Sequence, residues 1–255
     1  MAENTQVAES FKNMPTLLSD KLDAVKDALP QGFNKARFIQ NCIALLNDDP
    51  DKFKQYSPAT ILTGLLKASY LDLNFYANEC YLIPYGKKLN FQTSYTGSMK
   101  LAKKYSSRPV KDIYSKLICE GDEFEEIITN GEQSINFKPK FPRSKNIIGA
   151  FAVVVYKDGG LNYDVMTLEE LETTRKHSKA ANSGAWKDFT GEMYRKTVLR
   201  RLCKYIDLDF ENASQQEVFN EDAAIETDPM ELNEIQVEAG ANTVDFVDVD
   251  EVRAE

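Results

Sequence analysis

Hydrophobic residues at helical spacing predict two helices in the first third of the chain. Asn34 is suited to cap a helix, and apolar residues then recur three or four positions apart until Asp48-Asp49-Pro50 ends the pattern. Ser57-Pro58 combines a capping residue with a first-turn proline and begins a second helix, whose buried side contains Ile61, Leu62, Leu65, Leu66 and Tyr70. Residues 1–33 carry a weaker helical pattern, which fits an arm docked on a neighbour and a partly disordered segment equally well.

Alternating polar and apolar residues predict strands in the middle of the chain. From Cys80 the period changes to two, and Gly86-Lys87 turns the chain between the two strands of a hairpin. Two further pairs of strands are expected, each joined by a short turn: 110–119 with 124–128, and 147–156 with 161–166. Short turns join antiparallel neighbours, so the predicted sheet is mostly antiparallel.

Three more helices are predicted around and after these strands. A short helix follows Gly97-Ser98, and a second begins at the capping box formed by Thr167 and Glu170 and ends near His177. The longest runs from about Ala185 to Ile206, with Trp186 as a core anchor and further core positions at Phe189, Met193, Val198, Leu199 and Leu202. The whole pattern predicts an α+β protein in which helices pack on a mostly antiparallel sheet.

Charge divides the chain into unlike parts. Its 31 basic and 40 acidic residues give a net charge of −9, yet residues 35–205 hold 27 basic and 19 acidic residues, a local excess of +8. Residues 206–255 hold 16 acidic residues and one basic residue, and periodicity is not sustained beyond about Asn212. We therefore expect an N-terminal arm (1–33), one folded domain (34–206) and a disordered acidic C-terminal tail (207–255).

Basic residues gather at two places in the cationic region. The long helix carries one set at four-residue intervals, Lys196, Arg200 and Lys204, with Arg195 and Arg201 beside them. The second set is Lys100 and Lys104 on one face of the short helix, with Gln92 and Tyr95 just before it. Each set alone is typical of a solvated helix face, but two such sets in a region of net charge +8 predict a groove that follows a nucleic-acid backbone.

Cysteine usage and hydropathy favour a reduced compartment. The cysteines are widely spaced, lie in apolar runs as buried thiols do, and show no structural zinc spacing; they are Cys42, Cys80, Cys119 and Cys203. The chain has no run of 18 apolar residues and no N-terminal hydrophobic signal, which predicts a cytoplasmic protein. We expect neither a metal nor a cofactor.

Catalytic motifs are scarce in the sequence. No phosphate-binding loop of the G-x-x-x-x-G-K-[ST] type occurs, and the single histidine, His177, lies in a polar, basic helix end without a nucleophile motif. Carboxylates do cluster in one predicted strand turn and its solvent face, at Glu120, Asp122, Glu123, Glu125 and Glu126. The sequence therefore favours a nucleic-acid-binding protein that is not an enzyme, with a metal-dependent nuclease and a general nucleic-acid-binding adaptor as alternatives.

A series of short motifs resembles the RecT family of phage single-strand annealing proteins. The resemblance covers residues 31–206, and its most specific blocks, in family order, are Cys80-Tyr81-Leu82-Ile83-Pro84-Tyr85-Gly86, Phe91-Gln92, Tyr95-Thr96-Gly97, Leu101-Ala102, Glu120-Gly121-Asp122-Glu123-Phe124, Asp164-Val165-Met166-Thr167, Arg175, Ser178-Lys179, Trp186, Glu192-Met193, Lys196-Thr197 and Arg200-Arg201-Leu202-Cys203-Lys204-Tyr205. Glycine and a basic residue are usual in the family at Ser94 and Thr96, and proline is usual at Ala185 and often found at Asp207. These departures make the long helix a better candidate for DNA contact than the loop around Tyr95.

The resemblance implies an ATP-independent protein that binds single-stranded DNA and anneals complementary strands during phage homologous recombination. It also implies a homo-oligomer, as a ring or helical filament, in a bacterial host, with a phage exonuclease and the host single-stranded DNA-binding protein as partners. The expected architecture is a β-β-β-α core with neighbouring helices that form a DNA groove. Family positions that are polar or basic correspond to the candidate DNA contacts Gln92, Tyr95, Lys100, Lys104, Arg175, Lys196, Arg200, Arg201 and Lys204.

Overall fold

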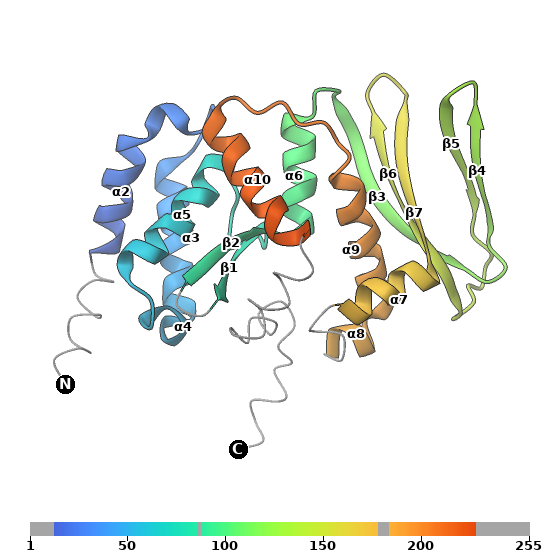
Figure 1. Ribbon diagram of the computed structural model, residues 1–255, viewed down its shortest axis with the longest axis horizontal. Helices are drawn as coiled ribbons and strands as arrows, with labels where there is room; N and C mark the ends of the chain where they lie inside the picture. The colour runs from blue at the N-terminus through green and yellow to red at the C-terminus, as the bar shows by residue number, and fades with distance from the viewer. Residues whose placement is uncertain (1–12, 86–87, 178–183, 228–255) are drawn as a thin grey trace, which may run out of the picture. The chain divides into compact units, whose positions relative to one another are not determined.

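The computed structural model describes residues 13–85, 88–177 and 184–227, and these residues form two compact units (Figure 1). The first unit contains residues 13–97 and 210–227, and the second contains Ser98–Asp209. The boundary falls within one helix, α6 (Tyr95–Tyr105). The folded domain predicted over 34–206 contains residues of both units.

The first unit is mainly helical. Its elements are α2 (Met14–Ala24), the 3₁₀ helix η1 (Lys26–Ala28), α3 (Lys35–Asp48), α4 (Pro50–Lys54), α5 (Pro58–Leu71), the hairpin of β1 (Cys80–Tyr85) and β2 (Lys88–Thr93), and α10 (Ala213–Thr227). The predicted caps of α3 and α5 are confirmed, because Asn34 accepts a hydrogen bond from the Arg37 N–H and Ser57 accepts one from the Thr60 N–H. The short helix α4, capped by Asp49, was not predicted.

Both ends of the first unit contribute to its core. Leu18 and Leu22 of α2 are fully buried against α3 and α5, so the described part of the expected N-terminal arm belongs to this unit. Helix α10 packs on α5 with Gln215 and Val218 buried, and thus extends regular structure beyond Asn212, where the sequence had suggested a disordered tail. Its apolar residues are too few to give a periodic pattern. The rest of the expected tail, residues 228–255, lies outside the described residues.

A three-stranded antiparallel sheet forms the centre of the second unit. Its order is β3 (Val110–Cys119), β6 (Ile147–Tyr156) and β7 (Leu161–Thr167), and α7 (Leu168–His177), α8 (Gly184–Asp188) and α9 (Thr190–Cys203) follow in the chain. Helix α9 packs across all three strands, and Figure 1 shows it on one side of the sheet, with strands β4 and β5 on the other. The predicted α+β class, with its β-β-β-α core and mostly antiparallel pairing, is confirmed.

Strand pairing differs from the prediction at one place. The strands expected over 110–119 and 124–128 do not pair with each other. The second forms part of β4 (Glu123–Thr129), which pairs instead with β5 (Glu132–Lys138), a strand that was not predicted. The turn between them is Asn130-Gly131, in which both residues have positive φ, as tight hairpin turns require. Phe124, Ile135 and Phe137 of this hairpin pack on Phe151 of β6.

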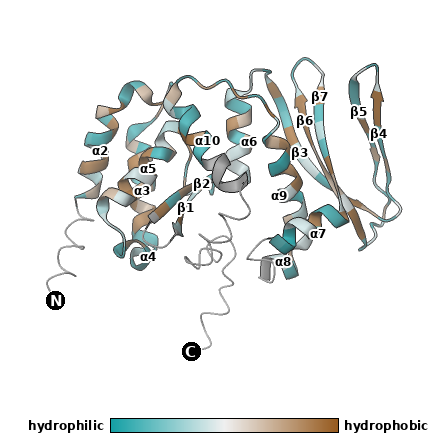
Figure 2. Cartoon of the chain, in the orientation of Figure 1, coloured by the Kyte–Doolittle hydropathy of each residue, from teal (hydrophilic) through white to brown (hydrophobic). Residues whose placement is uncertain are grey.

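The long helix predicted over 185–206 is interrupted. Phe189 separates α8 from α9 and is 63% exposed, so its assignment to the core is wrong. The other predicted core positions are buried, namely Trp186, Met193, Val198, Leu199 and Leu202. Figure 2 shows hydrophobic and hydrophilic residues alternating along α9, as expected for a helix that is buried on one side.

The four cysteines are free thiols, and each is buried, as predicted. Burial raises the pKa of Cys203 to about 12, which keeps this thiol protonated and unreactive. Among the residues that the structure describes, no helix is both long enough and apolar enough to cross a bilayer.

Candidate nucleic-acid interface

Helix α9 carries basic residues along one stripe. Lys196 and Arg200 are half-buried and Lys204, which follows the last residue of the helix, is exposed. Residues four positions apart lie on nearly the same side of a helix, so these three side chains follow one line along α9. We call Lys196, Arg200 and Lys204 the α9 stripe. Other positions of the helix bury Val198, Leu199 and Leu202, and α9 contacts all three strands of the sheet.

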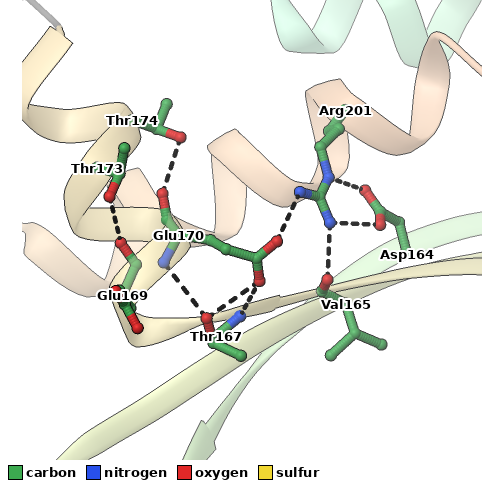
Figure 3. A network of polar contacts seen from close by, with 8 residues as sticks. All are labelled: Asp164, Val165, Thr167, Glu169, Glu170, Thr173, Thr174 and Arg201. Atoms are coloured by element: carbon green, nitrogen blue, oxygen red, sulfur yellow. Dashed lines mark hydrogen bonds and ion pairs between the residues drawn. The ribbon is translucent and has the colours of Figure 1, made fainter.

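The Arg201 side chain points toward Asp164 of β7 and Glu170 at the start of α7 (Figure 3). Its guanidinium donates through Nε and Nη2 to the two carboxylate oxygens of Asp164 on β7, the latter bond being 2.6 Å long, and Nη2 also donates to the Val165 carbonyl at 2.7 Å. The side chains of Arg201 and Asp164 are 33% and 14% exposed. The hydrogen bonds with Asp164 raise the pKa of Arg201, so the charge is permanent. Arg201 therefore fastens α9 to β7.

The same guanidinium also reaches the start of α7. Nη1 of Arg201 lies 3.4 Å from Glu170 Oε1, while the other oxygen of Glu170 accepts the backbone N–H of Thr167 at 2.8 Å (Figure 3). The Glu170 N–H in turn donates to the Thr167 hydroxyl, which completes the predicted capping box. These hydrogen bonds, from Thr167 first and then from Arg201, lower the pKa of Glu170. Arg201 thus joins α9, β7 and α7 in one polar network.

Arg175, another predicted DNA contact, lies in a cluster at the end of α7. Its guanidinium is 3.4 Å from Glu172 and stacks over the buried Trp186 ring at 5.5 Å. The Tyr194 hydroxyl of α9 donates to the same Glu172 carboxylate, and the Tyr194 ring contacts Trp186 edge-on. Desolvation, followed by the hydrogen bond to Glu172 and then the charge of that carboxylate, raises the pKa of Tyr194 to about 12. These contacts give Arg175 a part in holding α7 and α8 to α9.

The second predicted set lies on both sides of the unit boundary. Gln92 is on β2 and half-buried, and Tyr95 is the first residue of α6; both belong to the first unit. Ser94 caps this helix, because its hydroxyl accepts the Gly97 N–H at 3.1 Å. Lys100, half-buried, and Lys104, exposed, belong to the second unit, where the Lys104 ammonium lies 4.9 Å from the centre of the Tyr105 ring.

Asp122, one of the carboxylates considered for a nuclease, has structural contacts at the base of the β4–β5 hairpin. The Asp122 side chain is 0% exposed; it accepts the backbone N–H groups of Cys119 at 2.9 Å and Lys140 at 2.8 Å, and pairs with Arg143 at 2.7 Å. Arg143 also donates to the Leu117 carbonyl, so the pair closes the hairpin base. In the described part of the chain, no group of three or more His, Cys, Asp or Glu side chains is arranged to hold a metal ion.

Tyr76 is one of several exposed aromatic residues that the sequence analysis did not single out. Tyr76 is 61% exposed in the loop between α5 and β1, next to the buried Phe75. Asparagines on both sides, Asn74 and Asn78, are the usual signal of a turn, but residue type alone does not tell which of two adjacent aromatics points outward.

Comparisons with known proteins agree with the resemblance seen in the motifs. The RecT family model matches residues 36–233. The chain is 28% identical to the Escherichia coli (strain K12) protein named Protein RecT over 212 residues, which is 79% of this chain and 76% of that protein. It is 26% identical over 202 residues to Uncharacterized protein YqaK of Bacillus subtilis (strain 168), covering 78% of this chain and 69% of that protein. Since the family match spans most of the chain, the protein belongs to the RecT family of recombination proteins that anneal single strands.

Proposed function

We propose that this protein binds single-stranded DNA and pairs complementary strands without ATP. The observation that carries the proposal is the α9 stripe on a helix fixed to the sheet, in a chain that the RecT family model matches. Basic side chains in a line neutralise successive phosphates and release their counterions, which gives affinity without regard to sequence. This is the property that an annealing protein requires.

The physics of annealing makes a fuel unnecessary. Stacking and pairing supply on average about 1.4 kcal/mol per base-pair step once two strands meet in register. The protein has to reduce the repulsion between phosphates and keep one strand unfolded with its bases accessible. A cationic stripe does both, because it holds the strand by its backbone and leaves the base edges to the second strand.

We assign different roles within the predicted set. The α9 stripe forms the main phosphate contact, and Gln92, Tyr95, Lys100 and Lys104 remain candidate DNA contacts. Arg201 and Arg175 are positioning residues, because their guanidinium groups are held by Asp164, Glu170 and Glu172. Their charges keep α9 in place, so their contribution to DNA binding is indirect.

The proposal includes the partners implied by the family. We propose that the protein works as a homo-oligomer, in which neighbouring subunits hold successive stretches of one strand. We also propose that a phage exonuclease supplies the single strand and that the host single-stranded DNA-binding protein hands it over. If the protein accelerates strand pairing in the absence of both partners, it has the activity on which their cooperation depends.

The first test is an annealing assay with two complementary oligonucleotides, one labelled with a donor and the other with an acceptor dye. We expect the wild-type protein to accelerate pairing without nucleotide and to leave the length of both labelled strands unchanged in magnesium. Shortened strands would support the nuclease alternative. Binding without faster pairing would support the adaptor alternative.

The second test addresses the α9 stripe. The variant Arg200→Ala/Lys204→Ala should bind oligo(dT) more weakly, and the slope of log K against log salt should fall by about 1.4, since each phosphate contact on a single strand contributes about 0.7. The control Lys138→Ala/Lys157→Ala removes the same charge from the second unit, at exposed positions of β5 and the β6–β7 turn. If both variants lost the same oligo(dT) affinity and salt dependence, the effect would come from net charge alone, and the assignment of the α9 stripe as the phosphate contact would be contradicted.

A further inference from the structure

The loop that carries Tyr76 is held rigidly by hydrogen bonds. The Asn74 N–H donates to the Glu79 carboxylate at 2.8 Å, and the Tyr76 N–H donates to the Asn74 side chain at 2.8 Å. The Asn78 and Glu79 N–H groups donate to the carbonyls of Phe75 and Asn74 at 3.0 and 3.1 Å. A loop whose backbone groups are satisfied in this way presents its side chains in one arrangement.

This loop is also fastened to the segment that contains Tyr95. The hydroxyls of Ser94 and Thr96, the two neighbours of Tyr95, both donate to the Asn78 carbonyl, at 2.6 and 2.7 Å. The Ser94 N–H donates to the Glu79 carbonyl at 3.0 Å. The approach is so close that a Cβ atom at Gly97 would lie 2.0 Å from the Glu79 carbonyl oxygen. Tyr76 and Tyr95 therefore lie on two segments that form one rigid body within the first unit.

The two aromatics of the loop face opposite environments. Phe75 is 5% exposed and anchors the loop in the core, whereas Tyr76 is 61% exposed. An aromatic ring that stays in water does not contribute the free energy that its burial in the core would give. Because the backbone of this loop is already fixed, less conformational entropy is lost when the Tyr76 ring binds a partner. Rings presented in this way are typical of binding surfaces.

We propose that Tyr76 stacks on a base of the bound single strand, on the same rigid body as the candidate contact Tyr95. The proposal rests on the proposed function above. Annealing restricts the kind of contact a protein makes with bases, because hydrogen bonds to their pairing edges would block the second strand. A tyrosine ring contacts the face of a base, accepts every base type and leaves the pairing edge accessible.

The experiment compares Tyr76→Ala, Tyr76→Phe and Tyr76→Trp in the full chain with the control Phe141→Ala, which removes an exposed ring from the second unit. The probes are oligo(dT), an abasic oligonucleotide of the same length, and an oligonucleotide with 2-aminopurine, whose fluorescence falls on stacking. We expect Tyr76→Ala to weaken oligo(dT) binding about fivefold or more, as loss of one base–aromatic stack does, with little effect on the abasic strand or on the salt slope. Tyr76→Phe and Tyr76→Trp should preserve oligo(dT) binding and the quenching of 2-aminopurine fluorescence.

The possible outcomes separate this inference from the proposed function. If the wild-type protein neither binds nor anneals strands, the proposed function fails. If the wild type binds and Tyr76→Ala binds equally well, with an unchanged melting temperature, the stacking role of Tyr76 is overturned and the ring belongs to another contact. Equal losses in Tyr76→Ala and Tyr76→Phe would also overturn stacking, because they would trace the effect to the hydroxyl.

Discussion

Replacing Arg201 with alanine should destabilise the second unit more than it weakens DNA binding. The change removes a two-pronged pair with Asp164 and a hydrogen bond to the Val165 carbonyl, and leaves the largely buried Asp164 carboxylate without its cation. Hydrogen bonds to charged groups are each worth about 1.5–3 kcal/mol, but one third of the Arg201 side chain is exposed, so water recovers part of this. We expect a loss of about 2–3 kcal/mol in the free energy of unfolding, or about 4–12 °C in melting temperature.

Thermal and denaturant unfolding, followed by circular dichroism, measure this loss. Arg195→Ala is the matched control, because Arg195 lies on the same helix and pairs with Glu192 one turn away on the exposed side; its loss should stay below about 0.5 kcal/mol. Arg201→Lys should recover only part of the stability, since an ammonium group cannot occupy both carboxylate oxygens at once. Asp164→Ala should resemble Arg201→Ala, and the double variant should lose less than the sum of the two.

DNA binding, measured well below the melting temperature, decides between the two roles of Arg201. If Arg201 only holds α9 in place, Arg201→Ala should bind oligo(dT) within about threefold of the wild type once the protein is folded. If Arg201 contacts a phosphate, Arg201→Ala should lose binding with an unchanged melting temperature, and Asp164→Ala, which releases the guanidinium, should bind more strongly. That second pair of results would refute our interpretation of the Arg201 network.

Three further predictions concern Asp122, Gly97 and the acidic residues of 228–255. Burial favours the protonated form of Asp122, but hydrogen bonds from Cys119, Lys140 and Arg143 outweigh it and lower the pKa, so this carboxylate stabilises the fold above about pH 4. Asp122→Asn should therefore lower the melting temperature at pH 7, and its difference from wild type should shrink as pH falls below about 4; a constant difference would contradict this. Gly97→Ala should destabilise the first unit by about 1–3 kcal/mol in urea unfolding, because its Cβ would meet the Glu79 carbonyl; an unchanged midpoint would show that the close approach relaxes freely. Deleting residues 228–255, which hold nine acidic residues and one basic residue, should tighten oligonucleotide binding at low salt without changing the melting temperature; unchanged binding would leave the tail a solubilising extension.

Local signals in the sequence were sufficient for much of the fold. The caps at Asn34 and Ser57 and the capping box at Thr167 each depend on residues three positions apart, so the sequence contains all the information needed. The same holds for the β6–β7 hairpin, whose glycine turn predicts its own pairing. The burial of Trp186 also followed from its place on a helix with an apolar face.

Pairings between distant segments were harder to predict. The sequence joined strands 110–119 and 124–128 because they are neighbours in the chain, whereas β3 pairs with β6 across the whole β4–β5 hairpin. The signal that was overlooked is Asn130-Gly131, a strong turn sequence that made β4 and β5 partners. Residue type also gave no indication that Arg201 pairs with Asp164 and Glu170 of its own fold.

The geometry of α9 connects the Arg201 network to the proposed annealing activity. Four residues of helix rise about 6 Å, so the members of the α9 stripe are about 6 Å apart along the axis. A strand lying along the helix would meet a regular row of cations that holds its phosphates and leaves its base edges to the second strand. The row keeps its spacing and direction only while α9 is fixed on the sheet. Arg201, which touches β7 and α7, therefore supports the spacing of the stripe through its contacts with Asp164 and Glu170.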